Sequence, residues 1–228
     1  MIDTLAAATN NAHKLEEFKR ILSGRIKNIV SIKDVLPGGC DPEETGKTFE
    51  ENAAIKALAV YRATGLPVFA DDSGLEVDAL SGAPGIYSAR YSAGGDAGNI
   101  DKLLKNLEDA ENRRARFVCV IALVLPQEIA NYNNPVGLVR GEFPPRPCRG
   151  PQEGNDHSPD NHSSFFFRGV TEGSILTERA GTGGFGYDPV FFSADLEKSF
   201  GACTVQEKDA VSHRRRALDQ MLDFLTSF

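Results

Sequence analysis

Short apolar runs and helical repeats alternate in the first part of the chain. Ile2–Ala8 and Val68–Ala70 are apolar runs of strand length. A first predicted helix ends at Gly24 and has hydrophobic residues three or four positions apart, at Leu15, Phe18, Ile21 and Leu22. A second begins at Thr48, which has capping-box spacing to a glutamate, and ends at Gly65 after an alanine-rich stretch.

The later part of the chain contains more predicted strand than helix. Arg116–Leu125 is predicted to be a strand, because its stretch FVCVIALVL is apolar throughout and rich in β-branched residues. Phe165–Leu176 is predicted to form one or two strands and Val190–Phe192 another. Helices are predicted for Asn99–Leu107 and from Ser212 onward. The last helix places five hydrophobic residues on one face: Ala217, Leu218, Met221, Leu222 and Leu225. This order of elements favours an α/β fold with a mixed sheet.

One segment lacks any such pattern. Residues 126–164 are rich in Pro, Asn, Gly and Ser, which predicts a long polar surface loop inserted into a single domain spanning residues 1–228. His157 and His162 lie five positions apart in it, and we interpret them as solvated loop histidines rather than metal ligands.

Net charge, cysteine content and the length of apolar runs indicate which classes of protein the chain can belong to. The formal net charge is -7 and the pI about 5.2, which argues against a nucleic-acid-binding protein. The four cysteines include no CxxC pair, so reduced thiols are expected, with Cys119 in the core. There is no run of about 18 apolar residues and no signal-peptide pattern, so the expectation is a cytoplasmic protein without a membrane segment.

Two polar segments directly follow predicted strands. After Ile2–Ala8, a helix start brings backbone N–H groups together, and Thr9, Asn11 and Lys14 add donors that suit an anion. The alternative is an ordinary helix cap with a solvated lysine.

The second polar segment is FADDSG. Adjacent aspartates after a buried strand are costly unless paired, and carboxylates suit Mg²⁺ bound together with substrate phosphates. An Asp-rich turn is the alternative interpretation. Glu43 and Glu44 lie in another acidic loop that, by itself, is typical of a solvated surface.

GTGGFGYDP, residues 181–189, contains the letters of a dinucleotide-binding fingerprint. It follows a polar segment and precedes a proline and a strand, whereas that fingerprint follows a strand and opens a helix. The remaining interpretation is a glycine-rich loop whose backbone can approach a ligand closely. Phe185 and Tyr187 would offer a face on which a base can stack, and Asp188 would offer a hydrogen-bond acceptor. A tight turn between strands is the alternative.

The last helix begins with SHRRR. Basic residues at the positive end of the helix dipole are unfavourable unless an anion or carboxylate lies nearby, so a ligand is indicated here too.

These segments together resemble the inosine/xanthosine triphosphate pyrophosphatase family. The matching stretches occur in the family's order and span nearly the whole chain: ATNNAHKLEEF, EETGKTFEENAAIKA, FADDSGLEVDALSGAPGIYSARY, GTGGFGYDPVFF and SHRRRAL. The resemblance implies an elongated mixed β-sheet with flanking helices and two lobes around a central cleft. It also implies Mg²⁺-dependent hydrolysis of ITP, dITP or XTP to the monophosphate and pyrophosphate by a homodimer.

The resemblance also assigns roles to residues. It makes Asp72 the catalytic residue and puts Glu43 and Asp72 at the metal positions, with Glu44 as the alternative to Glu43; the roles of Asp71 and Asp72 stay open. Triphosphate contacts would come from Thr9, Asn10, Asn11, Lys14 and Lys56. Contacts to the base and the rest of the substrate would come from Ser73, Phe185, Gly186, Tyr187, Asp188, Lys208, His213 and Arg214.

The sequence departs from the family at two points. Asn10 stands where the family commonly has glycine, which asparagine replaces well if the backbone is left-handed there. The insertion is longer than the family's usual hairpin. Two other functions stay open: a pyrophosphatase for other modified nucleotides, and a non-catalytic nucleotide sensor. An NAD oxidoreductase is disfavoured by the context of residues 181–189.

Overall fold

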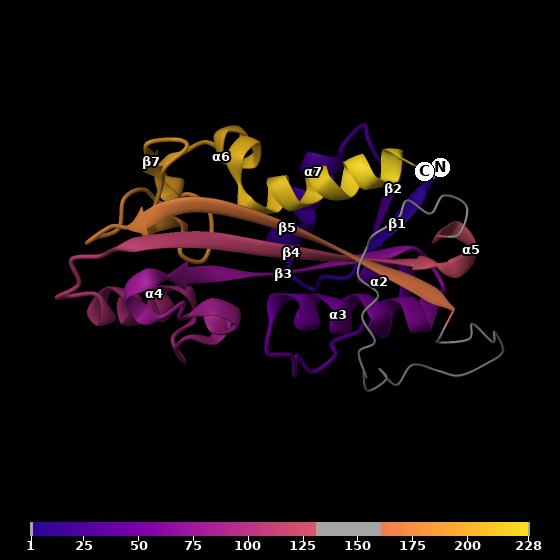
Figure 1. Cartoon of the computed structure of the whole chain (residues 1–228), viewed down its shortest axis with the longest axis horizontal. Coiled ribbons are helices and arrows are strands. Elements are labelled where there is room, and N and C mark those ends of the chain that lie inside the picture. Colours follow the sequence, from indigo (N-terminus) through magenta and orange to yellow (C-terminus); the bar gives the residue numbers. More distant parts are fainter. Residues whose placement is uncertain (1, 131–160, 228) are drawn as a thin grey trace. The chain divides into compact units, whose positions relative to one another are not determined.

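The computed structural model describes residues 2–130 and 161–227 (Figure 1). The chain divides into two compact units. Unit 1 consists of Met1–Asp72, Val120–Phe167 and Leu218–Phe228, and unit 2 of Ser73–Cys119 and Arg168–Ala217.

Seven strands of the described residues form one sheet in the order β2-β1-β3-β4-β5-β6-β7. Their bounds are β1 Thr4–Ala7, β2 Asn28–Ser31, β3 Val68–Val77, β4 Arg114–Pro126, β5 His162–Ile175, β6 Phe191–Ser193 and β7 Lys198–Ser199. β1 pairs in parallel with β2 and β3, whereas β6 pairs antiparallel with β5 and β7. The predicted mixed sheet is therefore confirmed.

Helices flank the sheet, as predicted. Their bounds are α1 Ala12–Leu22, α2 Ile32–Val35, α3 Phe49–Thr64, α4 Gly95–Asn106, α5 Gln127–Ala130, α6 Val205–Val211 and α7 His213–Thr226. The capping signals behave as the sequence indicates: the Thr48 side chain accepts from the Glu51 N–H, and Gly65 ends α3 with φ +67°. The elongated shape, the lobes and the cleft stay predictions.

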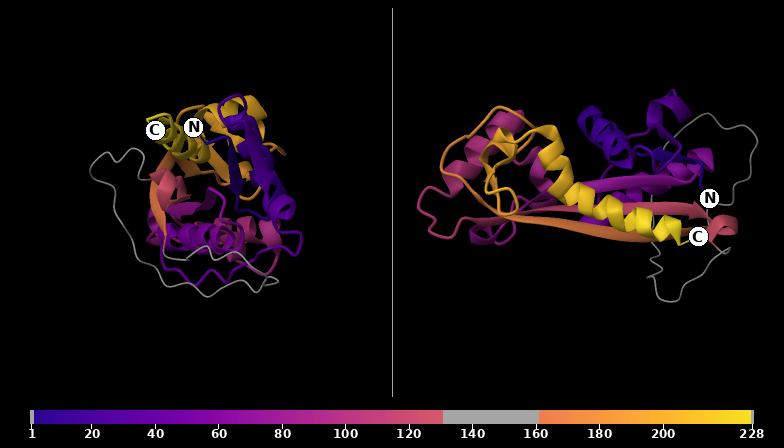
Figure 2. Two further views of the ribbon diagram at one scale, coloured as in Figure 1. Left: turned by 90° about the vertical axis from the view of Figure 1, so that its right-hand side faces the viewer. Right: turned by 90° about the horizontal axis from the view of Figure 1, so that it is seen from above.

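In unit 1, helices lie on both faces of β5. The ring of His162 lies 5.5 Å from that of Tyr61 on α3, whereas Phe165 and Phe167 contact Phe224 near the end of α7. Odd and even positions of a strand point to opposite faces, so α3 and the end of α7 cover opposite sides (Figure 1), and the view from above shows α7 over β5 (Figure 2). The interpretation of His162 as a loop histidine is therefore wrong.

Unit 2 has its own hydrophobic core, built around aromatic rings. Phe117 lies 4.5 Å from Phe191 and stacks on Phe200 at 6.0 Å. Tyr187 belongs to the same cluster. The core fixes the segment that follows the glycine-rich loop, because both Tyr187 and Phe191 are anchored in it.

The predicted boundaries of the Val68–Ala70 strand and of the 126–164 loop are wrong. β3 does not stop at Ala70 but continues through Asp71–Gly74 to Val77, so the Asp-rich turn is excluded. The alternation of buried Leu75 and Val77 supports the strand beyond the aspartates. The ends of the predicted 126–164 loop belong to β4, α5 and β5, and residues 131–160, with Cys148 and His157, lie outside the described residues.

Gly169 in β5 is expected to tolerate no side chain. A Cβ built there would lie 2.0 Å from the His213 carbonyl oxygen and 2.5 Å from the Ala217 nitrogen, both backbone atoms of α7. Gly169→Ala should destabilise the protein by about 2 kcal/mol or more, because backbone cannot move aside cheaply. Urea unfolding measures this, with Gly38→Ala as a control because a Cβ there meets nothing within 4 Å; equal stability of both variants would contradict it.

Candidate functional site

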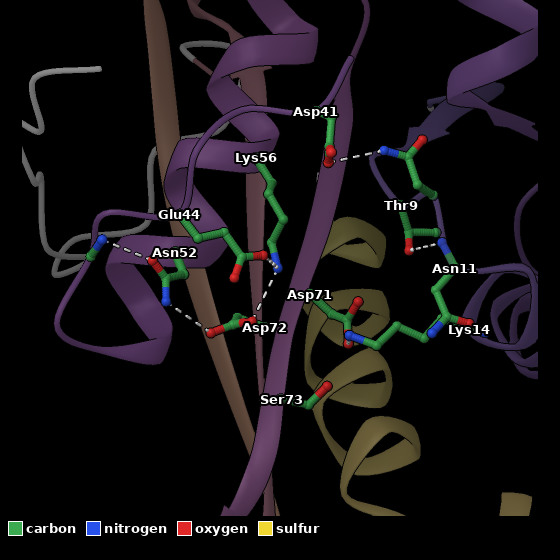
Figure 3. A network of polar contacts seen from close by, with 12 residues as sticks. Thr9, Asn11, Lys14, Asp41, Glu44, Asn52, Lys56, Asp71, Asp72 and Ser73 are labelled. Carbon is green, nitrogen blue, oxygen red and sulfur yellow. Dashed lines mark hydrogen bonds and ion pairs between the residues drawn. The ribbon is translucent and has the colours of Figure 1, made fainter. Parts of the chain in front are cut away.

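The side chains of the two adjacent aspartates of β3 point to opposite faces of the strand. Asp71, only 1% exposed, forms an ion pair with Lys14 of α1 at 2.9 Å. Asp72 points the other way, toward α3, and its Oδ1 lies 3.0 Å from Lys56 Nζ (Figure 3). The period of two along a strand enforces this division, so the two carboxylates have different surroundings.

Lys56 joins Asp72 to the acidic loop before α3. Its ammonium lies 3.0 Å from Glu44 Oε1 as well as 3.0 Å from Asp72 Oδ1 (Figure 3). Glu43, the residue assigned by resemblance, is exposed, and no contact of its side chain with Asp72 or Lys56 is found among the described residues. The structure thus brings the alternative, Glu44, to Asp72.

Burial and neighbouring opposite charges shift the pKa values of Asp72 and Lys56 in opposite directions. Burial raises the pKa of Asp72 above its ordinary value and outweighs the lowering by Lys56 and Lys14. Burial lowers the pKa of Lys56, but the carboxylates of Asp72, Asp71 and Glu44 overcome this and raise it on balance. The lysine is therefore held as a cation between carboxylates.

Asn52 of α3 also belongs to this cluster, and sequence reasoning missed it. Its Nδ2 lies 3.4 Å from Asp72 Oδ2, and its Oδ1 accepts a hydrogen bond from the Gly46 N–H at 2.9 Å. The signal was present in NAAIKA, because Asn52 and Lys56 are four residues apart and so lie on one face of a helix.

The start of α1 is organised by its own polar side chains. Asn11 caps the helix and accepts from the N–H groups of His13 and Lys14, while Thr9 Oγ1 accepts from the Asn11 N–H. Asn10 donates to the Cys40 carbonyl at 3.1 Å. The left-handed backbone considered for Asn10 is wrong, because only Ser81 and Glu197 have positive φ among the described non-glycine residues.

In unit 2, Asp188 and Lys208 form a buried ion pair beside the glycine-rich loop. Asp188 also accepts from the Phe185 N–H at 2.8 Å, and the Lys208 ammonium lies 4.6 Å from the centre of the Phe185 ring. A Cβ on Gly184, which has φ +74°, would lie 2.0 Å from Asp188 Oδ2, so this turn depends on glycine. The loop is thereby folded around a carboxylate.

Tyr187 faces inward, unlike Phe185. It is 5% exposed, and its hydroxyl donates to the Ser88 carbonyl at 2.9 Å. Burial, the largest influence, raises the pKa of the Tyr187 hydroxyl. The backbone N–H of Gly186, the residue before Tyr187, donates to Asp96 of α4 at 2.9 Å. This hydrogen bond was not predicted from the sequence. Of the two aromatic residues predicted to offer a face to a base, Phe185 is the less buried.

Two of the basic residues at the start of α7, His213 and Arg214, are buried, whereas Arg215 and Arg216 are partly exposed. The ring of His213 stacks on Phe117 with centroids 4.8 Å apart. Arg214, 1% exposed, donates to Ser73 Oγ at 3.1 Å, and its guanidinium lies 5.9 Å from the Phe185 ring centre. Ser212 accepts from the Arg215 N–H, as expected of an N-cap. Unit 2 therefore gathers Ser73, Phe185, Asp188, Lys208 and Arg214 through contacts among themselves.

Asp188→Asn is expected to reduce the free energy of unfolding by about 2–3 kcal/mol, because buried Lys208 loses its counter-charge while the amide oxygen can still accept from Phe185. Thermal unfolding measures this. The exposed pair of Lys198 and Glu207 offers the control, since Lys198→Ala should cost less than about 1 kcal/mol. A smaller loss for Asp188→Asn than for Lys198→Ala would contradict the prediction.

Comparison with known proteins places this arrangement in a family. Residues 5–156 and 155–224 match the Ham1 family. The chain belongs to the Ham1 family.

Relatives of this Ham1 chain are similar to it over nearly their whole length. A Staphylococcus epidermidis protein named dITP/XTP pyrophosphatase is 40% identical over 226 residues, covering 98% of this chain and 97% of the relative. A Shigella flexneri protein of the same name is 43% identical over 223 residues, covering 96% and 95%. The solved structure of a HAM1 protein from Coxiella burnetii matches with a TM-score of 0.77 and 34% identity over 100% of both chains. The family resemblance seen in the sequence is confirmed.

Two further features of the described part of this Ham1 chain concern metal binding and membrane insertion. Among the described residues there is no group of three or more His, Cys, Asp or Glu side chains placed to hold a metal ion. Nor does any helix in the described ranges have the length and apolar character to cross a membrane.

Proposed function

We propose that this Ham1-family chain hydrolyses non-canonical purine nucleoside triphosphates, namely ITP, dITP and XTP, to the nucleoside monophosphate and pyrophosphate. The observation that carries the proposal is the convergence of Glu44 and Asp72 on Lys56, in a chain about 40% identical to proteins named dITP/XTP pyrophosphatase. Paired carboxylates beside lysines are the groups that metal-assisted phosphoryl transfer uses.

Mg²⁺ fits the residues that are present. Glu44 and Asp72 offer hard carboxylate oxygens that already share one cation, and Mg²⁺ in nucleotide enzymes needs one or two carboxylates, with phosphates and water completing its shell. We assign Glu44 to the metal, and Asp72 is either its second ligand or the base that accepts the proton of the attacking water. When bound, it would neutralise charge on phosphate oxygens.

The chain's own residues account for the remaining steps. Lys14, Lys56 and the donors at the start of α1 would bind the triphosphate, since cations and N–H groups suit its oxygens. A water oxygen then bonds to the α-phosphorus, the bond to the bridging oxygen breaks, and pyrophosphate leaves. Asp72 has an elevated pKa, as suits a carboxylate that takes up the proton of that water if it does not bind metal.

Unit 2 would select the base. The cationic groups of Lys208 and Arg214 lie near the Phe185 ring, which offers a stacking face. Inosine and xanthine carry a 6-oxo acceptor where adenine carries a 6-amino donor, so cationic donors favour the oxo bases. His213 is a further candidate donor by resemblance. Gly186 and Tyr187 stay predicted contacts, as do the homodimer, the cytoplasmic location and the absence of nucleic-acid binding.

The direct test is to identify the products formed from ITP. The purified chain with MgCl₂ should release IMP and pyrophosphate, and excess EDTA should stop the reaction. Binding of ITP without any product would indicate a nucleotide sensor instead. Turnover of modified pyrimidine or methylated nucleotides in preference to ITP, dITP and XTP would indicate the broader pyrophosphatase.

A further inference from the structure

Asn52 occupies a position in which both of its side-chain hydrogen bonds to described residues bear on the candidate catalytic cluster. It is fully buried, at 0% exposure, on the α3 face that also carries Lys56 one turn later. The two side chains divide the carboxylate of Asp72 between them: Lys56 contacts Oδ1 and Asn52 contacts Oδ2. Both oxygens of Asp72 are thus held from one helix face.

The orientation of the Asn52 amide is fixed by its other partner. The Gly46 backbone N–H can only donate, so the amide must turn its oxygen to Gly46 and its NH₂ group to Asp72. The contact with Gly46 is close: a Cβ on Gly46 would lie 2.6 Å from Asn52 Oδ1. Because the amide cannot flip without losing this bond, Asn52 presents a donor to Asp72.

We propose that Asn52 is a positioning residue that holds the Asp72 carboxylate in its reactive orientation and ties it to the loop carrying Glu44. Gly46 lies two residues after Glu44, so one buried amide fastens both that loop and Asp72 to α3. The inference rests on the proposed function, since it concerns how the same reaction is supported.

Asn52→Asp separates positioning of Asp72 from anchoring of the loop. The carboxylate keeps an acceptor for the Gly46 N–H but turns an oxygen, instead of a donor, toward Asp72. We expect kcat for ITP to fall about 100-fold, as a misplaced reactive group does, with KM changed less than threefold. If Asn52 only anchored the loop, this variant would keep its kcat.

A second measurement needs no substrate. In Asn52→Asp, two carboxylates would face each other, so MgCl₂ should raise Tm more than it does in the wild-type protein. Equal Tm shifts would show that residue 52 does not face Asp72 and would overturn the proposal.

Asn99 in unit 2 provides the matched control. It is also a buried asparagine near the start of a helix, accepts from the Ser92 N–H and donates to backbone carbonyls rather than to a carboxylate. Asn99→Asp should lower Tm while keeping kcat within threefold. An equal loss of kcat in both variants would mean that destabilisation alone is the cause.

If Asn52→Asp does not fold, Asn52→Leu tests whether Asn52 positions Asp72, because leucine is similar in size to asparagine and carries no charge. A loss of kcat below tenfold in the folded variant overturns the proposal, and a larger loss with KM unchanged supports it. Wild-type protein is assayed in parallel: no turnover of ITP by wild type refutes the proposed function, whereas an active wild type with active Asn52 variants refutes only this inference.

Discussion

Asp72→Asn is expected to lower kcat for ITP by about 10³-fold or more while the protein remains folded. The amide has the shape of the carboxylate but can neither bind a metal as an anion nor take up a proton. Folding should survive because Lys56 keeps Glu44 as a counter-charge and the amide can still hydrogen-bond within the cluster. Steady-state kinetics with a pyrophosphate assay, together with Tm, measures both parts.

The neighbouring carboxylate supplies the control for this variant. Asp71 is also buried but pairs with Lys14 on the opposite face of β3. Asp71→Asn should raise KM and lower Tm, since Lys14 loses its partner, and should change kcat less than tenfold. If Asp71→Asn lost as much kcat as Asp72→Asn, the assignment of the reactive carboxylate to Asp72 would be wrong.

Glu44→Gln is expected to reduce kcat by about 10²–10³-fold and to raise the MgCl₂ concentration needed for half-maximal rate. The reason is its position: Glu44 is the carboxylate that meets Lys56 beside Asp72. Titrating the rate against MgCl₂ at saturating ITP separates a defect in metal binding from one in nucleotide binding.

Glu43→Gln is the matched control for Glu44→Gln, because it replaces the same carboxylate one residue earlier in the chain. Glu43 is exposed, so its variant should keep kcat and the MgCl₂ dependence within about twofold, as surface substitutions commonly do. A large defect in Glu43→Gln with a normal Glu44→Gln would restore the assignment made from resemblance.

Much of this site could be predicted from sequence because its signals are local. The N-cap at Thr48, the stop at Gly65 and the start of the last helix at Ser212 each depend on a few neighbouring residues, and the structure contains all three. The capping box is only half formed, because the Glu51 side chain accepts from the Lys47 N–H and not from that of Thr48. The extension of β3 past the aspartates was missed because Asp and Gly disfavour strands, whereas ion pairs across the fold neutralise the carboxylates here. Such partners are distant in sequence and leave no local pattern.

No sequence pattern predicts which of two similar neighbouring residues contacts the site. Glu43 and Glu44 are chemically identical neighbours in an irregular loop, and only the path of that loop decides which one meets Lys56. Phe185 and Tyr187 are both aromatic and two residues apart, yet the Tyr187 ring packs into the core of unit 2. The double contact of Asn52 depends on a backbone N–H, which every sequence supplies at nearly every position.

The ratio of kcat/KM for ITP to that for GTP and ATP, measured on the wild-type protein with MgCl₂, is the direct test of whether this chain hydrolyses non-canonical purine nucleotides selectively. Selection by donors around a purine should make ITP the better substrate by at least about 100-fold, because mismatched polar groups are left unpaired. Values of kcat/KM that agree within twofold for all three nucleotides would contradict hydrolysis selective for non-canonical purines.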